Sequence, residues 1–250
     1  MGEANEEGKL SVALMTSLAG AATPGGSLTV GQIAFKVLQP KAIISVGTCI
    51  SLDPEKVRMG DVVISANLTT AEGFRVPVSP RFGDLAKVAH HGWVPPLKNP
   101  RELDVNVHPN GDILSLSPEV KRQYVDICKA YPGAVAIETG GKGVYAAAHT
   151  TNIEWVIVKG VASHFHRNHS ATSGWNSFAS TMAASVVAEL LRHPIVFREW
   201  RHYNQGTQGV RHRASEGEQL PWREYGELYV RLFIWGKNLE KKKKKPWKKF

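Results

Sequence analysis

Short apolar runs rich in β-branched residues alternate with segments of helical periodicity over residues 9–193, and this alternation constrains the fold more than any other feature. It is typical of an α/β protein, in which helices cover the faces of a sheet. Because the runs are continuously apolar, we expect strands that are buried on both faces. They are Val12–Thr16, Ala42–Val46, Asp61–Ser65, Ala134–Glu138 and Trp155–Val161. The sequence therefore predicts an α/β domain with a mixed, mostly parallel central sheet flanked by helices.

Three helices are predicted around these strands. Apolar spacing indicates the first over Leu28–Leu38, just before Pro40. The second follows the capping sequence Ser117-Pro118-Glu119 and ends before Pro132. The third covers Thr172–Leu191 and presents an apolar stripe, which we expect to be buried against the sheet: Trp175, Phe178, Met182, Val186 and Leu190.

The chain divides into three zones, namely a polar leader (1–8), the α/β domain (9–193) and a basic C-terminal extension (194–250). The formal charge is +9, but residues 207–250 hold 12 Lys and Arg against 5 Glu and so account for +7 of it. The run Lys241–Lys245 repels itself and cannot form a core. We expect the extension to be largely irregular, with a disordered end that makes nonspecific contacts with anions.

The sequence predicts a cytoplasmic protein without a membrane span. The apolar runs are far shorter than the roughly 20 residues that cross a bilayer, and the acidic start Met1–Glu7 does not resemble a secretory signal. Cys49 and Cys128 lack CxxC spacing and are interpreted as reduced thiols. We expect no cofactor and no metal, because no Cys or well-placed carboxylate completes a ligand set with His164, His166 and His169.

Gly47 and Thr48 follow a predicted buried strand. In open α/β sheets, backbone amides at such a strand end can face a ligand. On pattern alone, a strand that simply ends in a loop is an equally good interpretation. The two residues become informative only together with other segments.

Several separated segments, taken in order, resemble the purine and uridine phosphorylases and the methylthioadenosine/S-adenosylhomocysteine nucleosidases. The resemblance covers about residues 9–193 and is carried by Val12–Ser17, Leu38–Leu52, Met59–Ser65, Asn110–Ser115, Ala134–Ala148 and Trp155–Ser163. Members of this family have further strands before the first of these segments, so the resemblance implies a domain that is truncated at its N-terminus. It also implies an enzyme that cleaves the N-glycosidic bond of a nucleoside, with water or phosphate as acceptor.

The family's chemistry depends on two carboxyl groups. The second Glu of a Glu-Met-Glu motif holds the ribose, whose ring becomes oxocarbenium-like in the transition state, and an Asp assists the departing base. Here the first motif reads Glu138-Thr139-Gly140, and Ser163 stands at the position of the Asp. Glycine offers nothing to a ribose diol, and a serine hydroxyl does not act as an acid near neutral pH. Catalysis is therefore expected to be weak or absent.

The resemblance also implies a ligand site for a purine nucleoside at the carboxyl ends of the strands. Its predicted members are Gly47, Thr48, Leu114, Glu138, Thr139 and Gly140, with Ser163 at the catalytic position. Phosphate as a second ligand, homo-oligomer formation and the preferred base stay open. Lys159 lies in a predicted buried strand, where it either pairs with a carboxylate such as Glu138 or contacts the ligand.

Two functions remain for the domain. One is an enzyme of nucleoside metabolism, and the other is a catalytically degenerate nucleoside-binding or regulatory module of a signalling protein. The missing carboxylates favour the second. Binding of an anionic polymer through the lysine-rich tail would leave the preceding domain unexplained.

Overall fold

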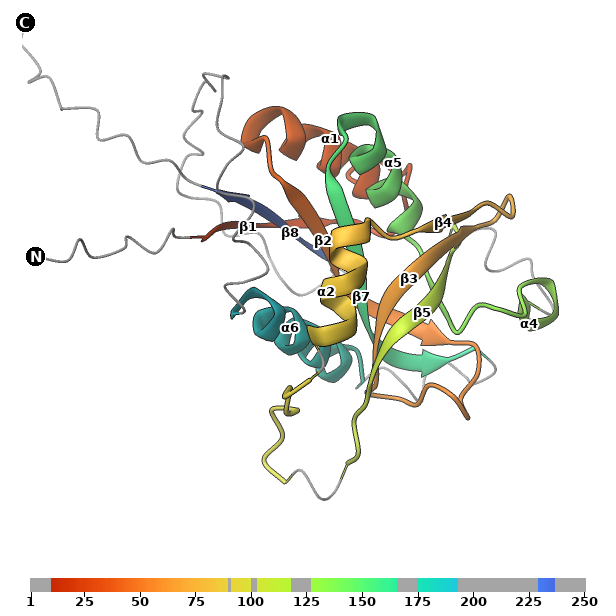
Figure 1. Ribbon diagram of the computed structural model, residues 1–250. Coiled ribbons are helices and arrows are strands. Elements are labelled where there is room, and N and C mark those ends of the chain that lie inside the picture. The colour runs from red at the N-terminus through yellow and green to blue at the C-terminus, as the bar shows by residue number, and fades with distance from the viewer. Residues whose placement is uncertain are drawn as a thin grey trace, which may run out of the picture.

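A mixed β-sheet with helices on both sides forms the body of the molecule (Figure 1). The computed structural model describes residues 10–89, 91–99, 103–117, 127–165, 175–192 and 229–236. The strands are β1 Leu10–Ser17, β2 Ala42–Ser51, β3 Val62–Thr70, β4 Arg75–Pro77, β5 Val107–Ser115, β6 Ala136–Glu138, β7 Glu154–His164 and β8 Tyr229–Gly236. The helices are α1 Ser27–Leu38, α2 Pro80–Ala89, α4 Ile127–Ala130, α5 Gly141–Thr151 and α6 Trp175–Arg192.

Five of the strands pair in a closed ring. β2 pairs with β7, β7 with β3, β3 with β5, β5 with β6, and β6 returns to β2. β4 pairs with β3 outside this ring, while β8 and then β1 extend the sheet from the first half of β2. β2 is therefore paired along both of its edges, which places it at the centre of the fold.

The helices cover the sheet from two sides. α1 and α5 pack against each other, whereas α6 lies on β7 and β2 with α2 beside it (Figure 1). At Gly160 of β7, a Cβ atom would lie 1.9 Å from the carbonyl oxygen of Ala179 in α6. Only glycine therefore lets α6 approach the strand so closely.

The central strands are buried on both faces, as their continuous apolar runs predict. Ile43, Ile44, Val156 and Ile157 are inaccessible to solvent, and they belong to one large apolar cluster. A smaller cluster, which includes Leu114, Leu116 and Ile137, lies around the ends of β5 and β6. This second cluster borders the region in which the sequence places the ligand site.

All five predicted strands are present, in β1, β2, β3, β6 and β7. The helix predicted over Leu28–Leu38 is α1, and the one over Thr172–Leu191 contains α6. Of the five apolar residues in the α6 stripe, Met182, Val186 and Leu190 are buried, but Trp175 and Phe178 are only half-buried. Most of the helix predicted after Ser117 lies outside the described residues, and α4 is its described end.

Pairing within the sheet differs from the prediction in one respect. The sheet is mixed, as expected, but parallel pairing among the described strands is confined to β2–β7, β3–β5 and β5–β6. Antiparallel pairing is more extensive than predicted. The β3–β4 hairpin, the β2–β6 and β3–β7 pairs of the ring, and the pairing of β8 with β2 are all antiparallel. The predicted strands did not include β4, β5 or β8, and β8 comes from the C-terminal extension.

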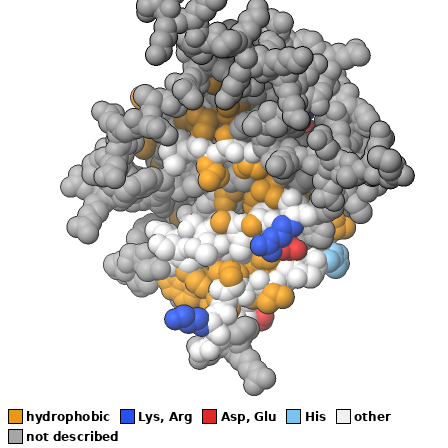
Figure 2. Space-filling model, turned by 90° about the vertical axis from the view of Figure 1, so that its left-hand side faces the viewer, with side chains coloured by type: hydrophobic (Ala, Val, Ile, Leu, Met, Phe, Trp, Pro, Cys, Tyr) orange, Lys and Arg blue, Asp and Glu red, His pale blue; other side chains and the backbone are white. Residues whose placement is uncertain are grey.

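One face of the molecule carries more apolar than charged side chains among the described residues (Figure 2). Large apolar side chains are also exposed on β1 and α1: Val12, Leu14, Ile33 and Val37. Within the described part of the chain, no helix is long and apolar enough to cross a membrane. Both cysteines are free thiols, with Cys49 buried in β2 and Cys128 half-buried in α4.

Candidate functional site

A cavity of about 420 Å³ opens where several strands end. The segments that line it follow β1, β3, β5 and β6, so it lies at the carboxyl ends of strands, where α/β folds commonly bind ligands. Its volume falls within the range of about 300–1,000 Å³ that is common for small-molecule sites. The lining residues are Gly20, Ala21, Ala22, Thr23, Leu28, Ala71, Glu72, Ser115, Leu116, Ser117, Thr139, Lys142, Gly143 and Ala146.

Hydrogen bonds between distant segments hold the wall of this cavity in place. The Gly20 amide donates to Oγ1 of Thr139 (3.3 Å), which ties the loop after β1 to the end of β6. The Lys142 amide donates to Oγ of Ser115 (2.9 Å), which ties the first turn of α5 to the end of β5. Hydrogen bonds from backbone amides to side-chain hydroxyls, and not packing alone, therefore hold the cavity wall in its shape.

The Glu138-Thr139-Gly140 turn joins β6 to α5. The Glu138 carboxylate is buried and accepts hydrogen bonds from the amides of Gly140 (2.8 Å) and Gly141 (2.6 Å). It thereby caps the N-terminus of α5, where a negative charge is favoured by the helix dipole. Glu138 is thus directed into the protein, and Thr139 is the member of this turn that lines the cavity.

Glu138 also faces the buried amine of Lys159, which is one of the two alternatives that the sequence left open for this lysine. Lys159 Nζ lies 3.9 Å from Glu138 Oε2, and both side chains are inaccessible to solvent. Burial raises the pKa of the nearby Cys49 thiol to about 12, against the opposing effect of the Lys159 charge. Cys49 is therefore a neutral thiol, and the Lys159–Glu138 pair is buried in the protein.

A second ion pair lies on the cavity wall. Lys142 Nζ, on the first turn of α5, contacts Glu72 Oε1 in the turn between β3 and β4, and both residues line the cavity. Their side chains are about half exposed, at 47% and 48%. The hydrogen bond from Lys142 lowers the pKa of Glu72 to about 2. Glu72 is therefore an ionised carboxylate at the cavity over the whole physiological pH range.

The structure brings only part of the predicted site to the cavity. Thr139 lines it, with Glu138 and Gly140 on either side of it in the turn. Gly47 and Thr48 lie within β2, opposite Lys159 and Gly160 of β7. Leu114 is fully buried in the smaller apolar cluster, and the next residues along β5, Ser115 and Leu116, line the cavity instead.

Ser163 lies near the carboxyl end of β7, beside Ile50. On its other edge, Ile50 pairs with Ile137 of β6, the residue before Glu138. Ser163 and the Glu138-Thr139-Gly140 turn therefore flank the same end of β2. The lining of the cavity does not include Ser163.

Sequence reasoning missed the Glu72–Lys142 pair. Glu72 and Lys142 are 70 positions apart, and each by itself looks like an ordinary surface charge. The one available signal was the position of Lys142, three residues after Thr139 in the turn that starts α5. Nothing in the sequence pointed to Glu72 as its partner.

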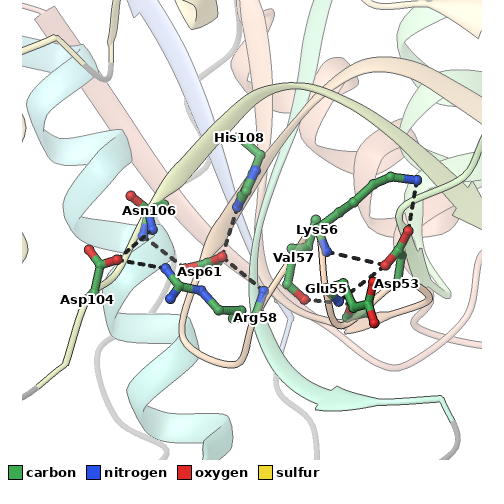
Figure 3. A network of polar contacts seen from close by, with 10 residues as sticks. Asp53, Glu55, Lys56, Val57, Arg58, Asp61, Asp104, Asn106 and His108 are labelled. Carbon is green, nitrogen blue, oxygen red and sulfur yellow. Dashed lines mark hydrogen bonds and ion pairs between the residues drawn. The ribbon is translucent and has the colours of Figure 1, made fainter.

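A separate polar network lies where β3 and β5 begin (Figure 3). Buried Asp61 accepts hydrogen bonds from the amides of Arg58 and Asn106 (both 2.9 Å) and contacts Nε2 of His108 (2.8 Å). Burial alone would raise the pKa of Asp61, but the hydrogen bond from His108 and those from the two amides lower it overall. Because this network joins strand beginnings, whereas the cavity lies at strand ends, we interpret it as structural.

The sequence profile of the Phosphorylase superfamily matches residues 8–193, the region that contains the ring of strands and α6. The chain belongs to the Phosphorylase superfamily. This confirms the family that the separated segments resemble. Superfamily membership accounts for the α/β ring but does not by itself establish an activity.

A curated relative is the death domain-containing ATP nucleosidase of Amphimedon queenslandica. The two are 25% identical over an alignment of 193 residues, and the match covers 65% of this chain and 36% of the relative. The chain thus spans little more than a third of the relative's length.

Solved structures of similar fold include two methylthioadenosine/S-adenosylhomocysteine nucleosidases. The one from Neisseria meningitidis, in complex with methylthio-immucillin-A, has a TM-score of 0.53 and 18% identity, covering 70% of this chain and 78% of that one. The one from Colwellia psychrerythraea, in complex with adenine, has a TM-score of 0.54 and 15% identity, covering 69% and 74%. At these identities the likeness concerns the fold.

Proposed function

We propose that this chain binds a purine nucleoside in the cavity at the strand ends and cleaves its N-glycosidic bond very slowly or not at all. The observation that carries the binding proposal is the preformed cavity of about 420 Å³ beside the Glu138-Thr139-Gly140 turn. Support comes from the nucleosidase relative and from the similar nucleosidases whose structures contain adenine or methylthio-immucillin-A.

The low activity is proposed from the residues that stand at the two catalytic positions. Gly140 has no side chain for the ribose, and Ser163 cannot protonate the departing base. Glu138 does not replace the missing ribose carboxylate, because it is buried, accepts the amides of Gly140 and Gly141, and does not line the cavity. A nucleoside-binding module of a larger signalling protein fits this set of residues better than a metabolic enzyme does.

The test is a calorimetric titration of the chain with adenosine, inosine and methylthioadenosine, paired with an assay of base release. We expect saturable binding of at least one of the three, with turnover far below the median of about 10 s⁻¹ for enzymes. Absence of binding by all three would disprove the ligand class. Robust base release by the wild-type chain would contradict the proposed low activity and would show that the chain is an active enzyme.

A further inference from the structure

The Glu72–Lys142 pair is the prominent charged feature of the cavity wall, and the proposed function does not use it. Each partner belongs to a different element: Glu72 to the β3–β4 turn and Lys142 to the first turn of α5. Their contact therefore joins two segments that are far apart in the sequence, and both residues line the cavity. A ligand in the cavity lies within reach of one or both charges.

Both partners are held by their backbones. Beside Glu72, the carbonyl oxygen of Ala71 accepts the hydroxyl of Tyr131 (2.8 Å), and the Gly73 amide donates to the Thr70 carbonyl (3.0 Å). Gly73 has φ +82°, a conformation that suits glycine and permits this tight turn. Lys142 is fixed through the hydrogen bond from its amide to Ser115. The two charges are thus presented to the cavity by rigid backbone.

A ligand can break the contact between the side chains of Glu72 and Lys142 with little loss of free energy. Because both are about half exposed, water already solvates them and their pairing contributes little to stability. A ligand that enters the cavity can therefore take over either charge. The carboxylate of Glu72 accepts hydroxyl donors, whereas the ammonium of Lys142 donates to oxygens, including those of a phosphate.

We infer that Glu72 and Lys142 determine the specificity of the cavity for the charge of its ligand, with Glu72 accepting the sugar hydroxyls of a neutral nucleoside and opposing a phosphate. Lys142 acts in the opposite direction and attracts the phosphate of a nucleotide. In the intact pair the two effects oppose each other, so removing one partner leaves the effect of the other. This inference rests on the proposed function and adds the two side chains whose charges set the balance between nucleosides and their phosphates.

The experiment measures the dissociation constants of adenosine and of adenosine 5′-monophosphate for the full chain by calorimetry. The readout is their ratio in the wild type, in Glu72→Gln and in Lys142→Met. Glu72→Gln removes the negative charge and should raise the affinity for the monophosphate relative to adenosine about tenfold, while adenosine itself binds more weakly. Lys142→Met removes the positive charge and should lower this relative affinity about tenfold. Lys142→Arg keeps the charge and should keep the ratio.

Asp53 and Lys56 provide the matched control. They form an exposed ion pair of 2.8 Å whose members are not among the cavity-lining residues (Figure 3), so Lys56→Met should leave the ratio unchanged. Ratios within twofold of the wild type in both Glu72→Gln and Lys142→Met would overturn the inference while leaving adenosine binding, and thus the proposed function, intact. If the wild type binds neither compound, the proposed function fails and this inference fails with it.

Discussion

At the scale of single residues, the carboxylate of Glu138 has a structural role in the turn between β6 and α5. Its carboxylate caps α5 through two amides and compensates the buried charge of Lys159. Neither role needs a ligand. Glu138 therefore supports the fold, and under the proposed function the ribose position is Gly140.

Replacing Glu138 should accordingly affect stability. Glu138→Gln removes the carboxylate that faces the buried amine of Lys159, and we expect the free energy of unfolding to fall by about 3 kcal/mol or more. Urea denaturation measures the change. The double variant Glu138→Gln with Lys159→Met also removes the buried positive charge and should recover part of the loss. Equal stability of Glu138→Gln and the wild type would show that the pair does not matter for folding.

Restoring the two missing carboxylates tests the degenerate chemistry. Gly140 has φ −111°, which any residue can adopt, so glutamate fits its backbone. Gly140→Glu with Ser163→Asp should raise base release from adenosine more than either single change, because one group acts on the sugar and the other on the base in the same transition state. Gly140→Gln with Ser163→Asn is the matched uncharged control. Failure of the restored variant to exceed that control would contradict the assignment of these two positions.

At the scale of elements, the junction of β3 and β5 should make stability depend on pH. The pKa of Asp61 is lowered in the folded protein, so its contribution is present above its unfolded pKa of about 3.9 and is lost as the pH falls below that value. Asp61→Asn should cost about 1–3 kcal/mol of unfolding free energy at pH 7, a difference that narrows toward pH 3. Denaturation at both pH values checks this, with the exposed Glu55→Gln as control. A pH-independent difference would contradict the ionic role.

Sequence patterns predict those elements in which the type of each side chain follows its burial in the fold. Continuous apolar runs predict β2 and β7 because both strands are buried on both faces, and helical spacing predicts α1 and α6. Trp175 and Phe178 deviate because they stack edge to face at 5.3 Å beside the Gly60 turn, near the start of α6. β4 is three residues long and has no pattern of its own.

The candidate site was only partly predictable, because local sequence patterns indicate single elements and not which loops come together. The Glu138-Thr139-Gly140 turn has a recognisable sequence, and it does contribute Thr139 to the cavity. The remaining wall comes from the loop at Gly20–Thr23 and from the β3–β4 turn, which meet it only after the chain has folded. No pattern in the local sequence indicates that these loops come together at the cavity.

At the scale of the whole molecule, β8 makes the C-terminal extension part of the sheet. It pairs with β1 over its full length and with Ala42–Val46 of β2. Deleting residues 229–250 should therefore lower the melting temperature by about 5 °C or more. Deleting only residues 241–250, which lie outside the described residues, should leave it unchanged, because the lysine run cannot be buried. Equal melting temperatures for the two truncations would contradict the pairing of β8.

The double pairing of β2 also affects how the protein is made. On the ribosome, β2 is complete early, but its partners β7 and β8 are synthesised much later. Until they emerge, both edges of a strongly apolar strand expose unpaired backbone groups, which is a template for aggregation. Pairing over such sequence separations is also slow. The nascent chain should thus depend on chaperones that bind extended apolar segments, and its yield in a cell-free system should rise when they are added.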